Sequence, residues 1–344
     1  MKLCTFDLTT QLGRHRRLGA ILSAGIVDLN SACVWHLYRK GESQPYRLAG
    51  ALLPPDMLGY LEGGMTSAAF ARKALEDVQQ ALASGAPLNG PNDEVLLFNP
   101  EEVKLKAPLP RPSSMRDFFA FEQHVKKGFE KRGEPMPQEW YEIPVYYKGA
   151  HWSIIGPDED VQWPSFTEKF DYELELAIII GREGRNIPES EAGAHIAGYT
   201  IMNDFSARDI QRREMKVRLG PAKGKDFATS IGPAIITPDE IGDPYNLLMT
   251  ARINGELWSQ GNSGSMHHTF EKMIAFASMD ETLRPGDLIG SGTVGTGCGL
   301  ELDRWLKPGD VVELEIEKIG RLRNKVVRDT RPGLKTQQGI QNSF

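Results

Sequence analysis

Cysteine is scarce in this chain of 344 residues, which carries only Cys4, Cys33 and Cys298. Cysteines so far apart in sequence offer neither a disulfide framework nor the closely spaced pairs of a zinc knuckle. Their odd number is typical of a protein in a reducing compartment. We therefore expect a cytoplasmic protein.

Long hydrophobic runs and an excess of positive charge are also missing. The apolar stretches, such as residues 176–180, are far shorter than the ~20 residues of a membrane-spanning helix, and we expect no signal peptide because the first residues lack an apolar centre. The formal net charge of -6 disfavours a polyanionic partner. These absences predict a protein that binds neither a membrane nor a nucleic acid.

What is present is the composition of a folded globular protein, with a length that suits one large domain or two. We predict a small β-rich N-terminal domain over residues 1–105. Its expected elements are a hairpin that turns at residues 23–25, a short strand near 95–98 and one helix, which starts at 66 or 67 and stops at Gly85.

Residues 106–330 are predicted to form a larger domain, and the polar residues 331–344 a flexible C-terminal tail. The patterning predicts strands at residues 171–181, 198–203, 232–237, 248–253, 287–290 and 311–319. It predicts helices at residues 118–132, from just after Asp204 through Arg208 to Met215, and at residues 269–278. The predicted fold class is therefore mainly β with a few helices.

Two acidic residues interrupt the strand at residues 171–181. Successive side chains of a strand alternate between its faces, so Glu173 and Glu175 are expected to point the same way, while Leu174 and Leu176 point the other way. Two carboxylates so close together repel each other unless a cation or solvent lies on that face. The pair therefore indicates either a cation site or the polar face of a solvated edge strand.

Other polar residues occur in contexts that a β-rich core does not require. His124 follows Asp117 by seven residues, which is two helical turns, so the two could share a helix face or His124 could be structural. Asp204 precedes a predicted helix, either as a functional group or as its N-cap. On that helix Arg208 and Gln211 lie on one side.

Two further polar residues lie among glycines. Lys225 occurs in GPAKGKDF, and Glu301 follows GSGTVGTGCGL. Glycines let the backbone approach a ligand closely, and they serve tight turns equally well. The glycine pattern is not that of a dinucleotide-binding fold, because it does not lie between a strand and a helix.

Taken together, these motifs resemble the fumarylacetoacetate hydrolase superfamily, and the resemblance covers most of residues 107–344. It rests on Asp117, on Glu173 and Glu175 in DYELELA, and on Asp204 in NDFSARDIQ, all in the family's order. The resemblance implies a mixed β-roll catalytic domain, preceded by a small SH3-like or α+β domain, and a homodimer. It also implies a metal-dependent hydrolase, such as a fumarylacetoacetase of aromatic compound breakdown.

The resemblance also implies a role for each residue of the site. The implied metal ligands are Asp117, Glu173, Glu175 and Asp204. The implied catalytic residues are His124, Lys225 and Glu301, the last of these in a late strand. The implied substrate-binding positions are Arg208, Gln211, Tyr147 and Phe119. Phe119 replaces a tyrosine of the family, and Met215 lies near the place of another, which suggests a less polar acid arm on the substrate.

The chemistry of these groups leads to a functional hypothesis with alternatives. Carboxylate ligands favour a hard divalent cation, Mg²⁺ first, with Ca²⁺ or Mn²⁺ as alternatives. With His124 and Glu301 activating water and Lys225 stabilising an enolate, the predicted reaction is cleavage of a carbon–carbon bond in a 1,3-diketo acid. The alternatives are a decarboxylase, isomerase or dehydratase of a 2-keto acid on the same metal core, or a metal-stabilised binding protein without catalysis.

Overall fold

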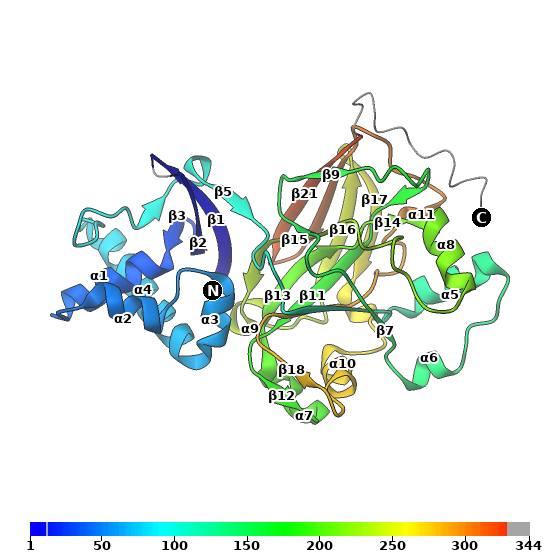
Figure 1. Ribbon diagram of the computed structural model, residues 1–344, viewed down its shortest axis with the longest axis horizontal. Coiled ribbons are helices and arrows are strands. Elements are labelled where there is room, and N and C mark those ends of the chain that lie inside the picture. The colour runs from blue at the N-terminus through cyan, green and yellow to red at the C-terminus, as the bar shows by residue number, and fades with distance from the viewer. Residues whose placement is uncertain (12, 329–344) are drawn as a thin grey trace.

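The fold is a large sheet with a smaller sheet packed on one face and helices on the other, as seen in the computed structural model (Figure 1). The structure describes residues 1–11 and 13–328. The C-terminal tail predicted at residues 331–344 lies outside the described residues. Within them, no helix is both long and apolar enough to cross a membrane.

The large sheet has twelve strands, and strands far apart in the sequence lie side by side in it. Its order is β4 (Leu97–Phe98), β3 (Gly25–Asp28), β2 (Gly13–Leu22), β1 (Lys2–Thr10), β15 (Thr229–Ile236), β13 (Ile196–Asn203), β11 (Leu174–Ile180), β19 (Asp287–Gly290), β6 (Ser114–Phe118) and β7 (Tyr146–Lys148). Beside this path, β5 (Lys104–Lys106) pairs with β1, and β8 (Ile154–Ile155) pairs with β15. Because β1 pairs with β15, the N-terminal strands continue the sheet that carries β11.

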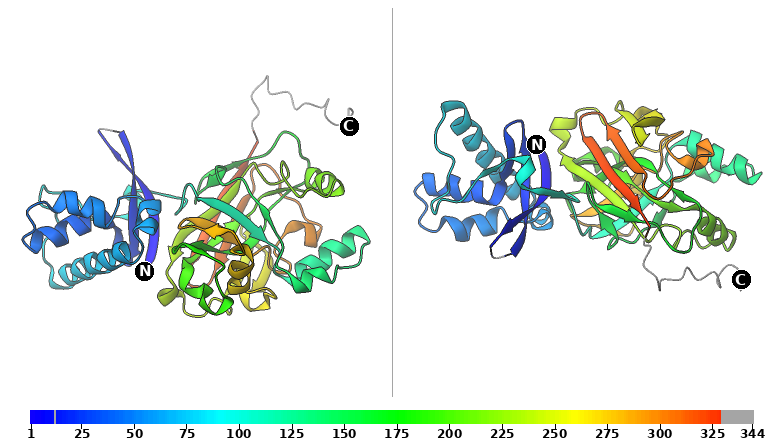
Figure 2. Two further views of the ribbon diagram at one scale, coloured as in Figure 1. Left: turned by 60° about the horizontal axis from the view of Figure 1, so that its bottom comes forward. Right: turned by 90° about the horizontal axis from the view of Figure 1, so that it is seen from above.

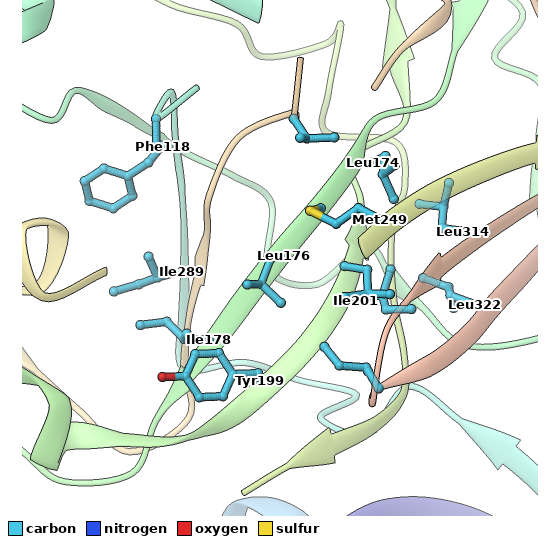
Figure 3. Close-up of a cluster of buried hydrophobic side chains, with 14 of the residues drawn as sticks. Phe118, Leu174, Leu176, Ile178, Tyr199, Ile201, Met249, Ile289, Leu314 and Leu322 are labelled. Carbon is cyan, nitrogen blue, oxygen red and sulfur yellow. The ribbon is translucent and has the colours of Figure 1, made fainter. Parts of the chain in front are cut away.

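The smaller sheet has five strands, in the order β17 (Glu256–Asn262), β16 (Leu248–Ile253), β20 (Val311–Ile316), β21 (Gly320–Val327) and β9 (Asp160–Gln162). Two short pairs complete the strands, β10 (Phe170–Asp171) with β14 (Ser206–Ala207), and β12 (Gly184–Arg185) with β18 (Thr282–Leu283). Leu176 and Ile178 of β11 face Met249 and Leu314 of this sheet across the main core (Figure 3). Period-two alternation therefore directs one side of β11 into this core.

The opposite face of β11 is buried as well. Ala177 and Ile179 belong to a second core, which includes side chains from the N-terminal helices. A strand covered on both faces is expected to read as a continuous apolar run, and this explains the segment LAIII. Glu173 and Glu175 are 4% and 0% exposed, so they do not lie on a solvated edge strand.

The N-terminal region contains more helix than the sequence predicts. Its helices are α1 (Leu29–Arg39), α2 (Pro45–Leu52), α3 (Met57–Glu62), α4 (Gly64–Ser84) and the short 3₁₀ turn η1 (Pro100–Glu102). They form a layer at the end of the molecule away from α5 and α8 (Figure 2). The prediction of a single helix in a β-rich domain is therefore wrong, and the chain is mixed α/β.

Helix α1 shows why the sequence patterns did not predict the additional helices of this region. Its segment 29–39 is rich in apolar residues that are buried on several sides, so it lacks the one-sided pattern of a surface helix. The sequence feature that marks the start of this helix is its N-cap, where the Asp28 side chain accepts a hydrogen bond from the backbone N–H of Ser31. By contrast, the one-sided helix α4 was predicted, and it ends at Gly85 with the expected left-handed conformation.

The remaining helices lie mostly around the larger sheets. They are α5 (Glu122–Arg132), α6 (Glu139–Glu142), α7 (Glu189–Ala192), α8 (Arg208–Lys216), α9 (Pro238–Ile241), α10 (Phe270–Ala277), α11 (Gly299–Leu302) and the 3₁₀ turns η2 (Gly193–His195) and η3 (Ser263–Ser265). The predictions of β16, β19 and α10 are confirmed to within one residue. Helix α8 begins at Arg208, later than predicted, because residues 206–207 pair as β14, so Asp204 is not its N-cap. The domain boundary near residue 106 stays a prediction.

Candidate active site

The candidate site lies where α5, α8 and α11 approach strands of the large sheet, at the end of the molecule away from the N-terminal helices (Figure 1). Asp117 is near the end of β6, and Glu175 is near the start of β11. Strand β19 separates these two strands, and its residue Gly290 pairs with Asp117. Because position 290 is glycine, no side chain fills the space between the two carboxylates.

Three of the four predicted metal ligands converge on one point. One carboxylate oxygen each from Asp117, Glu173 and Glu175 lies within 4.8 Å of the others. All three side chains are buried. The backbone N–H of Gly292 donates to Asp117 Oδ1 and to Glu175 Oε2, at 3.2 Å each. This group of three carboxylates is called the acidic cluster below.

The fourth predicted ligand, Asp204, stands beside the acidic cluster and not within it. Its Oδ2 lies 2.6 Å from Tyr147 Oη, which donates to it, and 2.6 Å from Lys225 Nζ. Its Oδ1 accepts a hydrogen bond from Thr229. Lys225 also contacts Glu173 Oε2 at 2.5 Å, so its ammonium joins Asp204 to the cluster. Tyr147 thus holds Asp204, and its predicted role in substrate binding stays a prediction.

The carboxylates of the cluster differ in their proton affinities. Burial raises the pKa of Asp117 and of Glu175 well above the usual range, and their acidic neighbours raise it further. Burial alone would also raise the pKa of Glu173, but the charges of Lys225 and Arg208 hold it below its ordinary value. The cluster thus contains one carboxylate that is compensated by cations and two that repel each other.

Arg208 donates hydrogen bonds to three neighbouring side chains of the protein. It donates from Nε to Asp171 Oδ2 at 2.8 Å, from Nη2 to Glu173 Oε1 at 2.8 Å and from Nη1 to Gln211 Oε1 at 3.0 Å. The guanidinium is buried, with a side-chain exposure of 6%. The predicted substrate contacts Arg208 and Gln211 therefore bind each other, and Arg208 orients Glu173.

Asp171 is a residue of the site that the sequence analysis missed. Its carboxylate is fully buried and accepts from Arg208 and from the backbone N–H groups of Gly299 and Leu300, at 2.7 and 3.0 Å. Those two N–H groups open α11, the helix that carries Glu301. Asp171 thus connects the arginine beside the acidic cluster with the helix that holds the predicted catalytic glutamate. An acidic residue two positions before Glu173 was the available signal.

His124 and Glu301 form a close pair, 2.7 Å apart between Nδ1 and Oε1. Glu301 Oε2 also accepts a hydrogen bond from the N–H of Thr296 at 2.9 Å. Although burial opposes it, the contact with His124 lowers the pKa of Glu301, which favours the carboxylate. Since Nδ1 faces Glu301, Nε2 is the ring nitrogen that remains for a substrate.

Two sequence-based placements of this pair are wrong. Asp117 and His124 do not share a helix, because Asp117 lies on β6 and the chain turns before His124 in α5. Glu301 lies in the short helix α11 and not in a strand. In both cases an apolar segment next to a turn was assigned to the wrong secondary structure, because period alone does not separate short strands from short helices.

Phe119 packs against His124. Its ring meets the His124 ring edge to face, with 5.4 Å between the centroids. Its carbonyl oxygen accepts a hydrogen bond from Trp140 Nε1 at 2.6 Å. Phe119 was predicted to bind substrate, and the structure also gives it a contact that restricts the orientation of His124.

Comparison with known proteins decides the family. The family model described as Fumarylacetoacetate (FAA) hydrolase C-terminal matches residues 114–327, which is more than half of the chain. The chain belongs to the fumarylacetoacetate hydrolase family. The matched region contains every residue of the acidic cluster together with His124 and Glu301.

Several members of the fumarylacetoacetate hydrolase family resemble this chain over most of its length. The human mitochondrial oxaloacetate tautomerase FAHD2A is 32% identical over 329 residues, 95% of this chain and 92% of that protein. The Bacillus subtilis oxaloacetate tautomerase YisK is 34% identical over 242 residues, 69% of this chain and 78% of that protein. A crystallised fumarylacetoacetate hydrolase from Exiguobacterium antarcticum is 25% identical, with a TM-score of 0.66, and the match covers 95% of this chain and 100% of that chain.

The donor set of this family member fits a divalent cation. Enzymes of the fumarylacetoacetate hydrolase family use such a cation. Here the donors are carboxylate oxygens, which suit Mg²⁺, Mn²⁺ or Ca²⁺. Burial and the neighbouring carboxylates raise the pKa of Asp117 and of Glu175 because they disfavour the ionised forms, and a divalent cation bound there would favour those forms again. The predicted metal set, with Asp204 as a fourth ligand, stays a prediction.

Cys298 is the second residue of the site that the sequence analysis missed. Its Sγ lies 3.5 Å from Glu301 Oε1 and 3.9 Å from His124 Nδ1. Its backbone forms an isolated bridge with Glu173 of the acidic cluster, while its thiol lies against the His124–Glu301 pair. The spacing of a cysteine three residues before Glu301 was visible in the sequence, but nothing there linked it to His124.

Proposed function

We propose that this protein is a divalent-cation-dependent tautomerase that interconverts the enol and keto forms of oxaloacetate or a related 2-oxo dicarboxylic acid. The observation that carries the proposal is the similarity to oxaloacetate tautomerases of a human and a bacterium, which extends over 95% and 69% of this chain. It supports the isomerase alternative better than the hydrolase predicted from the sequence.

The reaction requires one proton to leave the hydroxyl at C2 of the enol and one to arrive at C3. His124 is the group suited to carry the C3 proton, because its Nδ1 is held by Glu301 and its Nε2 remains for exchange. Glu301 stabilises the imidazolium that exists while the proton is on the ring. Phe119 limits the rotation of that ring.

The acidic cluster and Lys225 are suited to stabilise negative charge on the oxygen atoms of the substrate. A divalent cation held by Asp117, Glu173 and Glu175 would withdraw electron density from the 2-oxo group and so acidify the hydrogens at C3. The buried ammonium of Lys225, placed against Glu173 and Asp204, adds positive charge on the same side. Arg208 keeps Glu173 ionised and oriented.

The test follows enol decay after solid oxaloacetate is dissolved, using the near-ultraviolet absorbance of the enol with Mg²⁺ present. We expect the protein to accelerate the decay beyond Mg²⁺ alone, and His124→Gln to reduce the acceleration by about a hundredfold or more. His15→Gln is the matched control, since His15 is exposed on β2. Absence of acceleration by the wild-type protein, or an unchanged rate in His124→Gln, contradicts the proposal.

Hydrolysis of a 1,3-diketo acid is the second candidate. The His124–Glu301 pair favours it, because the same base could activate a water molecule. The similarity to the fumarylacetoacetate hydrolase of Exiguobacterium antarcticum supports it also. Release of two acids from an acylpyruvate, without acceleration of oxaloacetate enol decay, would favour hydrolysis. Carbon dioxide release from oxaloacetate would indicate a decarboxylase, and inactivity in all three assays a binding protein.

A further inference from the structure

We propose that Cys298, His124 and Glu301 form a second metal site, which takes Zn²⁺ and is separate from the acidic cluster. Zinc in this site would block His124 and so inhibit the enzyme. The inhibitory consequence rests on the proposed function, whereas zinc binding does not. The site is called the thiol site below.

The geometry supplies three different ligand atoms at one place. Cys298 Sγ, His124 Nδ1 and an oxygen of Glu301 lie within 4.8 Å of one another. The individual separations are 2.7 Å for Nδ1 to Oε1, 3.5 Å for Sγ to Oε1 and 3.9 Å for Sγ to Nδ1. Ligand atoms around a tetrahedral zinc, with bonds of about 2.0–2.3 Å, are roughly 3.3–3.8 Å apart. On this basis the His124–Glu301 separation must widen by about half an ångström, and the separation of Sγ and Nδ1 must shorten slightly.

The ligand types separate the thiol site from the acidic cluster. Sulfur and imidazole nitrogen favour zinc, whereas carboxylate oxygens alone favour Mg²⁺ or Mn²⁺. A thiolate and a carboxylate also balance the two charges of Zn²⁺, so the loaded site is neutral. Neutrality matters here, because Cys298 is fully buried and His124 is 6% exposed.

The proton balance explains why zinc would inhibit. Cys298 loses its thiol proton to solvent as the zinc–sulfur bond forms. Neutral His124 binds zinc through Nδ1 and therefore carries its single proton on Nε2. Glu301 is already a carboxylate, so one proton is released for each zinc bound. With zinc on Nδ1 and hydrogen on Nε2, the ring has no free lone pair, so it cannot become the imidazolium that passes a proton to C3 as the enol decays.

The neighbouring structure is suited to hold such an ion. Cys298 immediately precedes α11, and its backbone is anchored by the bridge to Glu173. Asp171 fixes the first N–H groups of α11, and Thr296 fixes Glu301. Two of the three ligands therefore come from one short segment that is already ordered, which lowers the entropic cost of binding.

The direct test uses Co²⁺ as a spectroscopic probe, with Mg²⁺ at millimolar concentration to occupy the acidic cluster. We expect the wild-type protein to develop the near-ultraviolet charge-transfer band of a cobalt–thiolate bond, and Cys298→Ser to lack it. Cys33→Ala is the matched control, because Cys33 is another buried free cysteine, and it should retain the band. A wild-type protein without the band, or a Cys298→Ser variant that retains it, overturns the proposal.

A second measurement requires no variant. X-ray absorption at the zinc edge, on wild-type protein loaded with one equivalent of Zn²⁺ beside excess Mg²⁺, should reveal one sulfur neighbour among nitrogen and oxygen neighbours. A shell of oxygen alone places zinc in the acidic cluster and overturns the thiol site, even if Cys298→Ser fails to fold. Both measurements remain valid if the protein proves not to be a tautomerase.

Inhibition is tested separately, by titrating Zn²⁺ into the enol-decay assay at saturating Mg²⁺. We expect the zinc concentration for half inhibition to rise at least tenfold in Cys298→Ser, with the rates expressed relative to each variant without zinc. Equal sensitivity of wild type and variant overturns the inhibitory role. That result would leave cobalt binding and the tautomerase proposal to be decided by their own assays.

Discussion

Asp171 and Arg208 form a buried ion pair, with 2.8 Å between Oδ2 and Nε. The arginine reaches onward to Glu173 of the acidic cluster, and the aspartate reaches to the start of α11. The pair therefore couples the position of the candidate metal ligands to the position of Glu301. A buried pair whose remaining hydrogen-bonding atoms are satisfied contributes chiefly to the geometry of its surroundings.

Replacing Asp171 should disturb both stability and catalysis. Asp171→Ala leaves a buried guanidinium with one carboxylate partner fewer, and breaking such a pair typically costs about 3–5 kcal/mol. We expect a lower urea midpoint and a lower kcat. Asp171→Asn retains the shape and should be less severe. The control is Arg185→Gln, which removes an exposed pair with Asp280 and should leave the unfolding midpoint unchanged.

A side chain at position 290 should weaken metal binding. A Cβ on Gly290 would meet Met202 and would lie 2.5 Å from Asp117 Oδ1 and 3.0 Å from Glu175 Oε2. Gly290→Ala therefore displaces two members of the acidic cluster, and we expect Mg²⁺ or Mn²⁺ affinity to fall by about tenfold or more, measured by calorimetry. Gly50→Ala is the control, since its Cβ would meet nothing within 4 Å. Unchanged affinity would exclude this location for the metal.

Removing the metal should lower the melting temperature, whereas removing one charge of the acidic cluster should raise the melting temperature of the metal-free protein. A metal that binds only the folded state at a hundred times its Kd adds about 2.7 kcal/mol of stability, so EDTA should lower the melting temperature. Glu175→Gln relieves the repulsion with Asp117, and we expect the metal-free variant to melt above metal-free wild type. Addition of Mg²⁺ should no longer raise its melting temperature. A normal Mg²⁺ response in this variant would argue against Glu175 as a ligand.

Acid should destabilise the protein partly through His268. Its Nε2 lies 2.6 Å from the carbonyl oxygen of Trp140, and its Nδ1 has no partner among residues 1–11 and 13–328. Burial lowers the pKa of His268, and the nearby Lys272 and His267 lower it further. A proton on His268 is therefore bound more tightly in the unfolded chain than in the folded protein. The contribution of neutral His268 to the free energy of unfolding is complete above about pH 6.5 and declines as the pH falls below that value.

The pH dependence can be assigned with one variant. We expect the loss of unfolding free energy between pH 7 and pH 5 to be smaller in His268→Gln than in wild type, by at most about 1.4 kcal/mol per pH unit for one proton. The exposed His15 provides the control, and His15→Gln should follow the wild-type curve. A His268→Gln curve parallel to the wild-type curve would show that other groups cause the acid sensitivity.

The homodimer implied by the family resemblance stays a prediction. Sedimentation equilibrium should give twice the chain mass of 38.3 kDa. A single-chain mass across the concentrations of the activity assays would contradict it.

Local alternation along a strand predicted one part of the acidic cluster, the placement of Glu173 and Glu175, whereas the resemblance to the family added Asp117. Because side chains alternate along a strand, Glu173 and Glu175 were predicted to share a face, and Leu174 and Leu176 do lie together in the opposite core. The order of Asp117, Asp204 and His124 around them identified the family. The one-sided helix α4 and its glycine stop were predictable for the same reason, since local periodicity determined both.

Only the tertiary structure decided what each polar group touches. The predicted roles of Arg208 and Tyr147 in substrate binding stay predictions, and the structure adds protein partners for both, since β10, β7 and β13 bring Asp171 and Asp204 close enough to accept their hydrogen bonds. Cys298 lies 174 residues from His124 in sequence and 3.9 Å from it in space. The sequence by itself supplied the candidate residues, through the order of their motifs and the alternation of side chains along one strand, because both patterns can be read along the chain. Their partners come from distant segments, and only the packing of two sheets and three helices brings those segments together.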